Sequence, residues 1–179
     1  MLHYSYKSII LEATMKKVKT NAMRLLEDQN IDYELLSFSL KADAITPEYI
    51  AEEIGKEVER IFKTIVTEGT SGNHYVFCLQ IIKELDLKKA AKAAGEKSIS
   101  LIDQRDLLKV AGYEKGGCSP VGMKKLYRTF YDAHALSYDR IIVSAGKRGY
   151  QIEVPVEGLL KATEGQTSDL LMETKSIFR

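Results

Sequence analysis

The chain has 179 residues, a formal net charge of +1 and an apolar content of 45%, a size typical of one domain that buries a core without metals or disulfides. Its near-neutral charge argues against a protein that coats nucleic acid, because extensive phosphate contact requires a clear excess of Lys and Arg. No apolar stretch is long enough to span a bilayer, no signal-peptide pattern opens the chain, and two cysteines make no disulfide framework. We therefore expect a cytoplasmic protein without membrane contact.

The first fourteen residues precede a second methionine, Met15, and the sequence MKKVKTNAMRLLEDQ that begins there is typical of a basic start followed by an amphipathic helix. We expect Met15 to be the natural start. Residues 1–14 are then an extension or a segment added for expression, and residues 15–179 form the folded domain.

Helical spacing with capping residues alternates with β-branched runs along the first half of the chain. The expected elements are, in order, a helix from Thr20 to about Asn30, a strand over 33–38, a helix over 46–55, a hairpin of strands 61–67 and 74–81, a helix over 86–95 and a strand over 98–102.

The second half continues with a helix over 103–112, a Gly-rich loop over 116–122, a strand over 125–131, a helical turn from Asp132, a hairpin of strands 140–145 and 150–154, and a helix over 155–162. Hairpins are thus mixed with helices rather than in strict alternation with them. This order predicts an α/β (α+β) single domain, in which helices surround a mixed, largely antiparallel, β-barrel-like sheet.

Lys63 is the first candidate functional residue. Alternation along 61–65 puts its amine on the same strand face as Ile61 and Ile65. One interpretation is an edge-strand lysine that reaches water, which the pattern alone favours; the other is a cation directed at an anion or a carbonyl.

The loop GGCSPVG over 116–122 is the second candidate, because glycines let consecutive backbone N–H groups converge on an oxyanion. The alternative is an ordinary tight connection between a helix and a strand. Cys118 has no neighbouring sequence feature that supplies a base, which argues against a nucleophilic role. The three histidines and two cysteines lack metal-ligand spacing, so no metal site is predicted.

Ser144 ends an apolar run and precedes Ala145-Gly146, so its hydroxyl lies where a strand enters a turn. There it either contacts a ligand or bonds to the turn backbone. Lys147 and Arg148 in the same turn form a short basic cluster, for which solvated surface is the plainer interpretation and a phosphate contact the alternative.

Four segments in collinear order resemble the signature segments of the YbaK/EbsC family: RIFKT around Lys63, LDLKKAAKAAG, GGCSPVG, and VSAGKRGYQIE over 143–153. The resemblance runs from about Asn21 to Leu171. This family is similar to the insertion editing domain of bacterial prolyl-tRNA synthetases, and the resemblance implies its fold, a mixed barrel-like sheet ringed by helices.

The resemblance also implies site residues and the absence of any cofactor. The family's lysine matches Lys63, the glycine of its GxxxP loop matches Gly116, and its pocket serine matches Ser144; these three are the expected catalytic residues. The pocket aromatic matches Phe38, which lacks the hydroxyl of the tyrosine in some relatives, and a second aromatic near Ile45 or Thr46 is not evident. Further substrate contacts are expected from Thr64, Gly117, Cys118, Ser119 and Pro120.

The implied activity is trans-editing: deacylation of mischarged Cys-tRNA(Pro), and by extension Cys-tRNA(Cys), at the acceptor end of the tRNA. The implied route is substrate-assisted, since the cysteinyl thiol attacks its own ester and releases a thiolactone. Prolyl-tRNA synthetase is the expected partner that supplies tRNA identity. Two alternatives remain open: a deacylase of the same fold for alanyl- or another aminoacyl-tRNA, and a non-catalytic module that binds an aminoacyl-tRNA or a synthetase.

Overall fold

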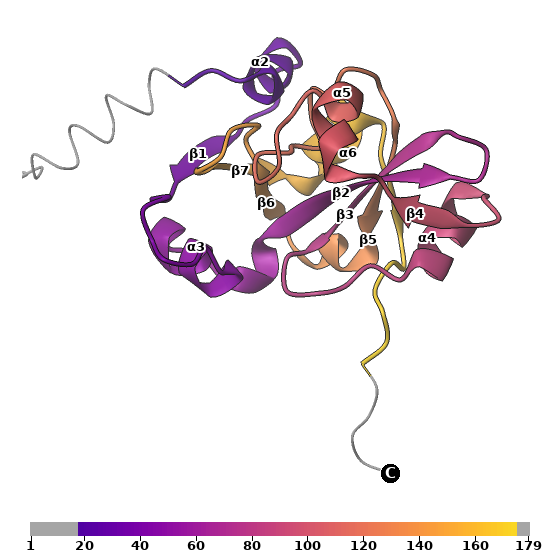
Figure 1. Ribbon diagram of the computed structural model, residues 1–179. Helices are drawn as coiled ribbons and strands as arrows, with labels where there is room; N and C mark the ends of the chain where they lie inside the picture. The colour runs from indigo at the N-terminus through magenta and orange to yellow at the C-terminus, as the bar shows by residue number, and fades with distance from the viewer. Residues whose placement is uncertain (1–17, 175–179) are drawn as a thin grey trace, which may run out of the picture.

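The computed structural model describes residues 18–174 (Figure 1); Met15 and the segment 1–14 lie outside the described residues. The α-helices in this range are α2 (Asn21–Asp28), α3 (Pro47–Ile54), α4 (Leu87–Ala94), α5 (Leu107–Ala111) and α6 (Val156–Thr163). The strands are β1 (Glu34–Ser37), β2 (Phe62–Gly69), β3 (His74–Gln80), β4 (Ile99–Leu101), β5 (Arg128–Asp132), β6 (Arg140–Ser144), β7 (Tyr150–Pro155) and β8 (Gln166–Ser168). Short 3-10 helices are η1 (Val58–Arg60), η2 (Gln104–Asp106) and η3 (Ala133–Ser137).

The strands form two sheets, one of three strands in the order β1-β7-β6 and one of five in the order β4-β2-β3-β5-β8. Four strand pairs are antiparallel and two, β3 with β5 and β5 with β8, are parallel. The predicted mixed, largely antiparallel α+β architecture is confirmed.

The two sheets do not close into a barrel. They meet at a single parallel bridge between Ile61 and Ile142. β4 pairs with β2 only over 67–69, so the first half of β2 has no full strand partner on that side. This partly unpaired half of β2 is where the two sheets diverge.

Helix ends follow the predicted capping residues. The hydroxyls of Thr20 and Thr46 accept hydrogen bonds from the third backbone amide after them, and Asp86 accepts from two amides at the start of α4. Gly55 and Gly95 end α3 and α4 in the left-handed conformation, with φ of 68° and 73°, which glycine adopts without a steric penalty. Local chemistry therefore determines where these helices begin and end.

Three features differ from the sequence prediction. The helix expected over 103–112 is divided into η2 and α5, because Asp103 caps the 3-10 turn rather than the α-helix. β5 begins at Arg128 instead of residue 125. β8 was not predicted, since its sequence QTS is short and polar and the strand is defined by its parallel pairing with β5.

Three apolar clusters hold the elements together. The largest lies between the two sheets and includes α2 and α6. A second packs α4 on the opposite face of the five-stranded sheet, where Phe77 stacks on Phe130 with ring centroids 5.3 Å apart. The third packs Ile50, Ala51 and Ile54 of α3 against the bridge between the sheets, and thereby positions α3 beside the candidate site. Over residues 18–174 no helix has the length and apolar character needed to cross a membrane.

Candidate active site

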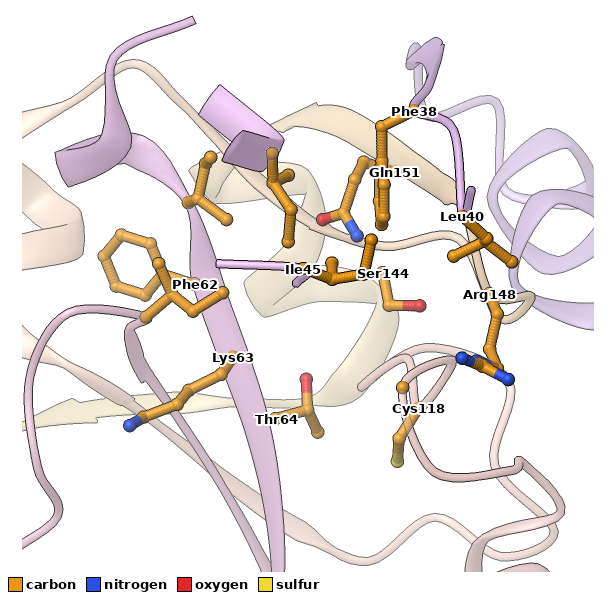
Figure 2. A pocket seen from close by; sticks show the side chains of 14 residues that line it. Phe38, Leu40, Ile45, Phe62, Lys63, Thr64, Cys118, Ser144, Arg148 and Gln151 are labelled. Carbon is orange, nitrogen blue, oxygen red and sulfur yellow. The ribbon is translucent and has the colours of Figure 1, made fainter. Parts of the chain in front are cut away.

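A cavity of about 370 Å³ opens where the two sheets meet, beside α3 (Figure 2). Its walls come from β2, β6, β7, the segment after β1 and the Gly-rich loop. The lining residues are Phe38, Leu40, Ile45, Ile50, Ile61, Phe62, Lys63, Thr64, Ile81, Gly116, Cys118, Ser144, Arg148 and Gln151. The walls are mainly apolar, and neither a carboxylate nor an imidazole is among these residues.

Lys63 and Thr64 project to opposite sides of β2 (Figure 2). Thr64 pairs with Cys78 across the ladder, and its hydroxyl lies 3.7 Å from the Cys78 sulfur. Lys63 pairs with Leu79, and its Nζ lies 3.8 Å from Glu84 Oε1. Since the Glu84 side chain is 79% exposed and the Lys63 side chain 26% exposed, this ion pair is weak. The amine therefore points away from Thr64 and Ser144 (Figure 2) and is held there only weakly, at the end of a flexible stem.

Ser144 bonds to the turn backbone, as one of the two interpretations made from the sequence expected, and its contact with a ligand stays a prediction. Its Oγ accepts a hydrogen bond from the Gly146 amide at 3.2 Å, which fixes the hydroxyl against the turn. The same side chain lines the cavity, and its proton remains available because the turn bond uses only a lone pair of the oxygen. Gln151, its register partner on β7, lies beside it.

The Gly-rich loop is fixed near its C-terminal end by hydrogen bonds of Val121. The Tyr113 hydroxyl donates to the Val121 carbonyl at 2.6 Å, and the Val121 amide donates to Ser119 Oγ at 3.3 Å. Gly116 adopts a φ of 81°, a conformation that disfavours other residues. The loop is therefore held in one shape before any ligand binds.

The loop amides are unequal as anion-binding groups. The Gly117 amide donates to the Glu114 carbonyl at 3.0 Å, so it is already engaged. The amides of Gly116 and Cys118 donate to no acceptor among residues 18–174. These two N–H groups, on residues that line the cavity, are the donors that remain for an oxyanion.

Cys118 is a protonated thiol at neutral pH, because burial raises its pKa to about 12. The same effect raises the pKa of the fully buried Cys78 to about 12. A thiol needs its anion to act as a nucleophile, so the structure supports the prediction that Cys118 is not one.

The cavity brings together six of the residues predicted from the sequence: Phe38, Lys63, Thr64, Gly116, Cys118 and Ser144. Three others lie outside its walls. Gly117 packs beneath the backbone of Lys147 and Arg148, Ser119 is buried, and Pro120 lines a separate hollow with Leu25 and Met123.

Several lining residues were not predicted. They are Leu40, Ile50, Ile61, Phe62, Ile81, Arg148 and Gln151. The predicted hairpin of 140–145 and 150–154 contained a signal for Gln151, because its register with Ser144 follows from the turn. Ile45 lines the cavity at the place of the missing aromatic, whereas Thr46 caps α3. Residues 18–174 contain no group of three or more His, Cys, Asp or Glu side chains that could hold a metal ion.

Comparison with known proteins gives a consistent result. The model of the aminoacyl-tRNA editing domain family matches residues 41–162. A protein of Enterococcus faecalis (strain ATCC 700802 / V583), named "Putative Cys-tRNA(Pro)/Cys-tRNA(Cys) deacylase EbsC", is 45% identical over 152 residues, which cover 85% of this chain and 93% of that protein.

Solved structures share the fold. One described as "Crystal structure of a putative trans-editing enzyme for prolyl tRNA synthetase" has a TM-score of 0.77 at 24% identity, and covers 88% of this chain and 100% of that one. Another, "Crystal structure of hypothetical protein APE2540", has a TM-score of 0.76 at 20% identity over 86% of this chain and 100% of that one. The resemblance inferred from the sequence is confirmed, and the chain belongs to the aminoacyl-tRNA editing domain family.

Proposed function

We propose that this protein deacylates mischarged Cys-tRNA(Pro), and also Cys-tRNA(Cys), by substrate-assisted cleavage of the aminoacyl ester. The observation that carries this proposal is the composition of the cavity: hydroxyls, amides and cations line it, but no carboxylate or imidazole does. Such a site can bind an ester and stabilise negative charge. It lacks the groups that most often activate a water molecule.

The cysteinyl substrate brings its own nucleophile. Its thiol loses a proton and attacks the ester carbonyl carbon, the carbonyl oxygen becomes an oxyanion, and the C–O bond to the ribose then breaks. The products are a four-membered thiolactone and a tRNA whose ribose oxygen has gained the proton. An intramolecular nucleophile avoids the entropy cost of bringing two reactants together, so the protein's part is to orient the ester and stabilise the oxyanion.

Each lining group has a role in this proposal. The amides of Gly116 and Cys118 donate to the oxyanion, and the Ser144 hydroxyl orients the substrate amine or the ribose. Lys63 swings from its weak pair with Glu84 to the developing negative charge. Phe38 and the isoleucines enclose the apolar parts of the terminal adenosine and aminoacyl group.

We further propose that prolyl-tRNA synthetase supplies tRNA identity. A net charge of +1 provides little electrostatic attraction for a whole tRNA, and the cavity has room for the acceptor end alone. Discrimination between tRNA(Pro) and tRNA(Cys) should therefore appear when the synthetase is added. Equal discrimination with and without it would contradict this partner.

Lys63 provides the test of the site. In single-turnover deacylation of Cys-tRNA(Pro), we expect Lys63→Ala to lower the rate by about a hundredfold, the effect of removing one oxyanion-stabilising group. Lys63→Arg should rescue poorly, since a planar guanidinium presents its charge differently. Glu84→Gln is the matched control, because it removes the partner of the amine and leaves the amine in place; its rate should equal or exceed that of the wild type.

Two results would contradict the proposal. A wild-type rate in a folded Lys63→Ala variant would remove Lys63 from the site. Faster hydrolysis of alanyl-tRNA than of cysteinyl-tRNA by the wild type would show a water-dependent deacylase, and binding without release of the amino acid would show a non-catalytic module.

A further inference from the structure

A second hollow of about 500 Å³ adjoins the candidate active site. Phe38, Leu40 and Arg148 line both spaces and follow one another along one side of the cavity (Figure 2). The other lining residues of the second hollow are Ser37, Ser39, Lys41, Glu53, Gly149 and Tyr150. A ligand that leaves the cavity past Phe38 therefore enters this hollow.

The chemistry of the second hollow suits one nucleotide. Lys41 and Arg148 supply two cations, and Phe38 and Tyr150 supply aromatic rings of the kind on which bases stack. The Phe38 amide donates to the Gly149 carbonyl at 2.9 Å, which fixes the turn that carries Arg148 to the end of β1. Arg148 thus stands at the boundary of the two spaces, where a phosphodiester that joins two nucleotides would lie.

Glu53 in this hollow is held in place by one of its oxygens. Its Oε1 lies 2.9 Å from the Tyr49 hydroxyl and accepts from the Ser39 amide at 3.3 Å. Within residues 18–174 no hydrogen-bond partner contacts Oε2. A fixed carboxylate oxygen with open acceptor capacity selects a donor, and the exocyclic amine of cytosine is the base-edge group that pairs with Glu.

We propose that the second hollow binds the penultimate cytidine of the tRNA acceptor end, with Glu53 accepting a hydrogen bond from the cytosine amine and Arg148 facing the phosphodiester to the terminal adenosine. This inference rests on the proposed function, since it extends the same substrate by one nucleotide. Because every tRNA ends in the sequence CCA, the contact reads a feature common to all tRNAs. It makes the site selective for an intact acceptor end.

Another hollow that Arg148 lines, of about 400 Å³, is the competing route. Its aromatic residue is Tyr113, which is buried and whose hydroxyl is bonded to the Val121 carbonyl, so it presents no platform for a base. Its carboxylate is Glu114. Glu114→Gln, the same substitution as Glu53→Gln but in this competing hollow, therefore serves as the matched control.

The test combines a change of the penultimate base in the RNA with a change of the Glu53 carboxylate in the protein. Two RNA minihelices, one ending in CCA and one in CUA, are used uncharged, and their dissociation constants are measured by fluorescence polarisation. Wild-type protein should bind the CCA end about tenfold more tightly, the effect of one hydrogen bond to a charged group. Glu53→Gln should abolish or reverse this preference, because the glutamine amide donates to the uracil carbonyl. Glu114→Gln should keep the wild-type preference.

The outcomes separate this inference from the proposed function. No measurable binding, no preference in the wild type, or an unchanged preference in Glu53→Gln would overturn it, and so would loss of preference in Glu114→Gln instead. Hydrolysis of the cysteinylated CCA minihelix is measured separately. If the wild-type protein prefers the CCA end but does not cleave the ester, the nucleotide site is supported and the proposed activity is refuted.

Discussion

Substitution of Gly117 by alanine tests whether the contact between the Gly-rich loop and the turn over 146–149 positions the active site. A Cβ at Gly117 would lie 2.9 Å from the Arg148 nitrogen and 3.2 Å from the Lys147 carbonyl carbon, whereas ordinary contacts begin at 3.4 Å. Both neighbours are backbone atoms and cannot rotate away. The loop and the turn must therefore separate by about half an ångström, which shifts the loop that carries the Gly116 amide relative to the turn after Ser144.

This displacement should lower both the stability and the activity of the variant. Overpacking of this kind destabilises by about 2 kcal/mol, which lowers Tm by about 4–8 °C for a chain of this length. Because a misplacement of about 1 Å can reduce catalysis a hundredfold, we expect kcat/KM for Cys-tRNA(Pro) to fall at least about tenfold, measured on the folded variant at a temperature well below its Tm.

Gly158→Ala is the control for a steric change away from the site. Its Cβ would meet Ile31 Cγ2 at 2.6 Å, but this atom is the end of a side chain and Gly158 lies in α6. Stability should change in this variant while kcat/KM stays at the wild-type value. Wild-type kcat/KM in Gly117→Ala, or an equal loss in both variants, would refute the positioning role of the contact.

Two further predictions concern buried ionisable groups. Cys118→Ala should keep most of the activity. In the wild type, iodoacetamide should modify Cys118 slowly at pH 8, because burial raises the pKa of this thiol from the ordinary value of 9.0 to about 12. The stability that the neutral thiol contributes is present below pH 9 and is lost as the pH rises toward 12. Glu153→Gln should lower the free energy of unfolding by about 3 kcal/mol in urea titrations, since this carboxylate is 8% exposed and lies 3.2 Å from Lys56 Nζ and 3.3 Å from Arg60 Nη2. Rapid labelling of Cys118 would contradict the first prediction, and an unchanged urea midpoint in Glu153→Gln would contradict the second.

The local elements of the fold were predictable because their signals are local. Thr20, Thr46 and Asp86 cap helices that begin at the next residue, and capping depends on atoms within one helical turn. The antiparallel hairpins β2–β3 and β6–β7 were predictable for the same reason, since short connections join their strands.

Pairings between distant segments were not predictable in this way. The parallel alignment of β3 with β5 joins Tyr75 to Arg128, and nothing near either residue specifies the other. β8 depends on β5 in the same manner. The division into two sheets, which meet at the bridge between Ile61 and Ile142, likewise depends on residues far apart in the sequence.

The candidate site, too, was only partly predictable from the sequence. Lys63, Gly116 and Ser144 were identified through the resemblance of their segments to the family's motifs, whereas their local patterns alone favoured ordinary structural roles; the three line one cavity. No sequence signal identifies Leu40 and Ile81 as site residues, since apolar residues line cavities and also fill cores. Arg148 resembled a solvated turn residue, and its position against Gly116 depends on how the loop and the hairpin turn meet.

The lining of the cavity has a consequence for selectivity. A site that carried a general base would activate water, and would then cleave any aminoacyl ester small enough to enter. This lining has no carboxylate or imidazole, and burial raises the pKa of its Cys118 thiol to about 12. In the mechanism that we propose, the rate therefore depends on the nucleophile that the substrate carries. Alanyl and prolyl esters have no side-chain nucleophile. Selection then occurs in the chemical step rather than in binding, which allows an apolar cavity of about 370 Å³ to accept several aminoacyl groups and cleave the one that can cyclise.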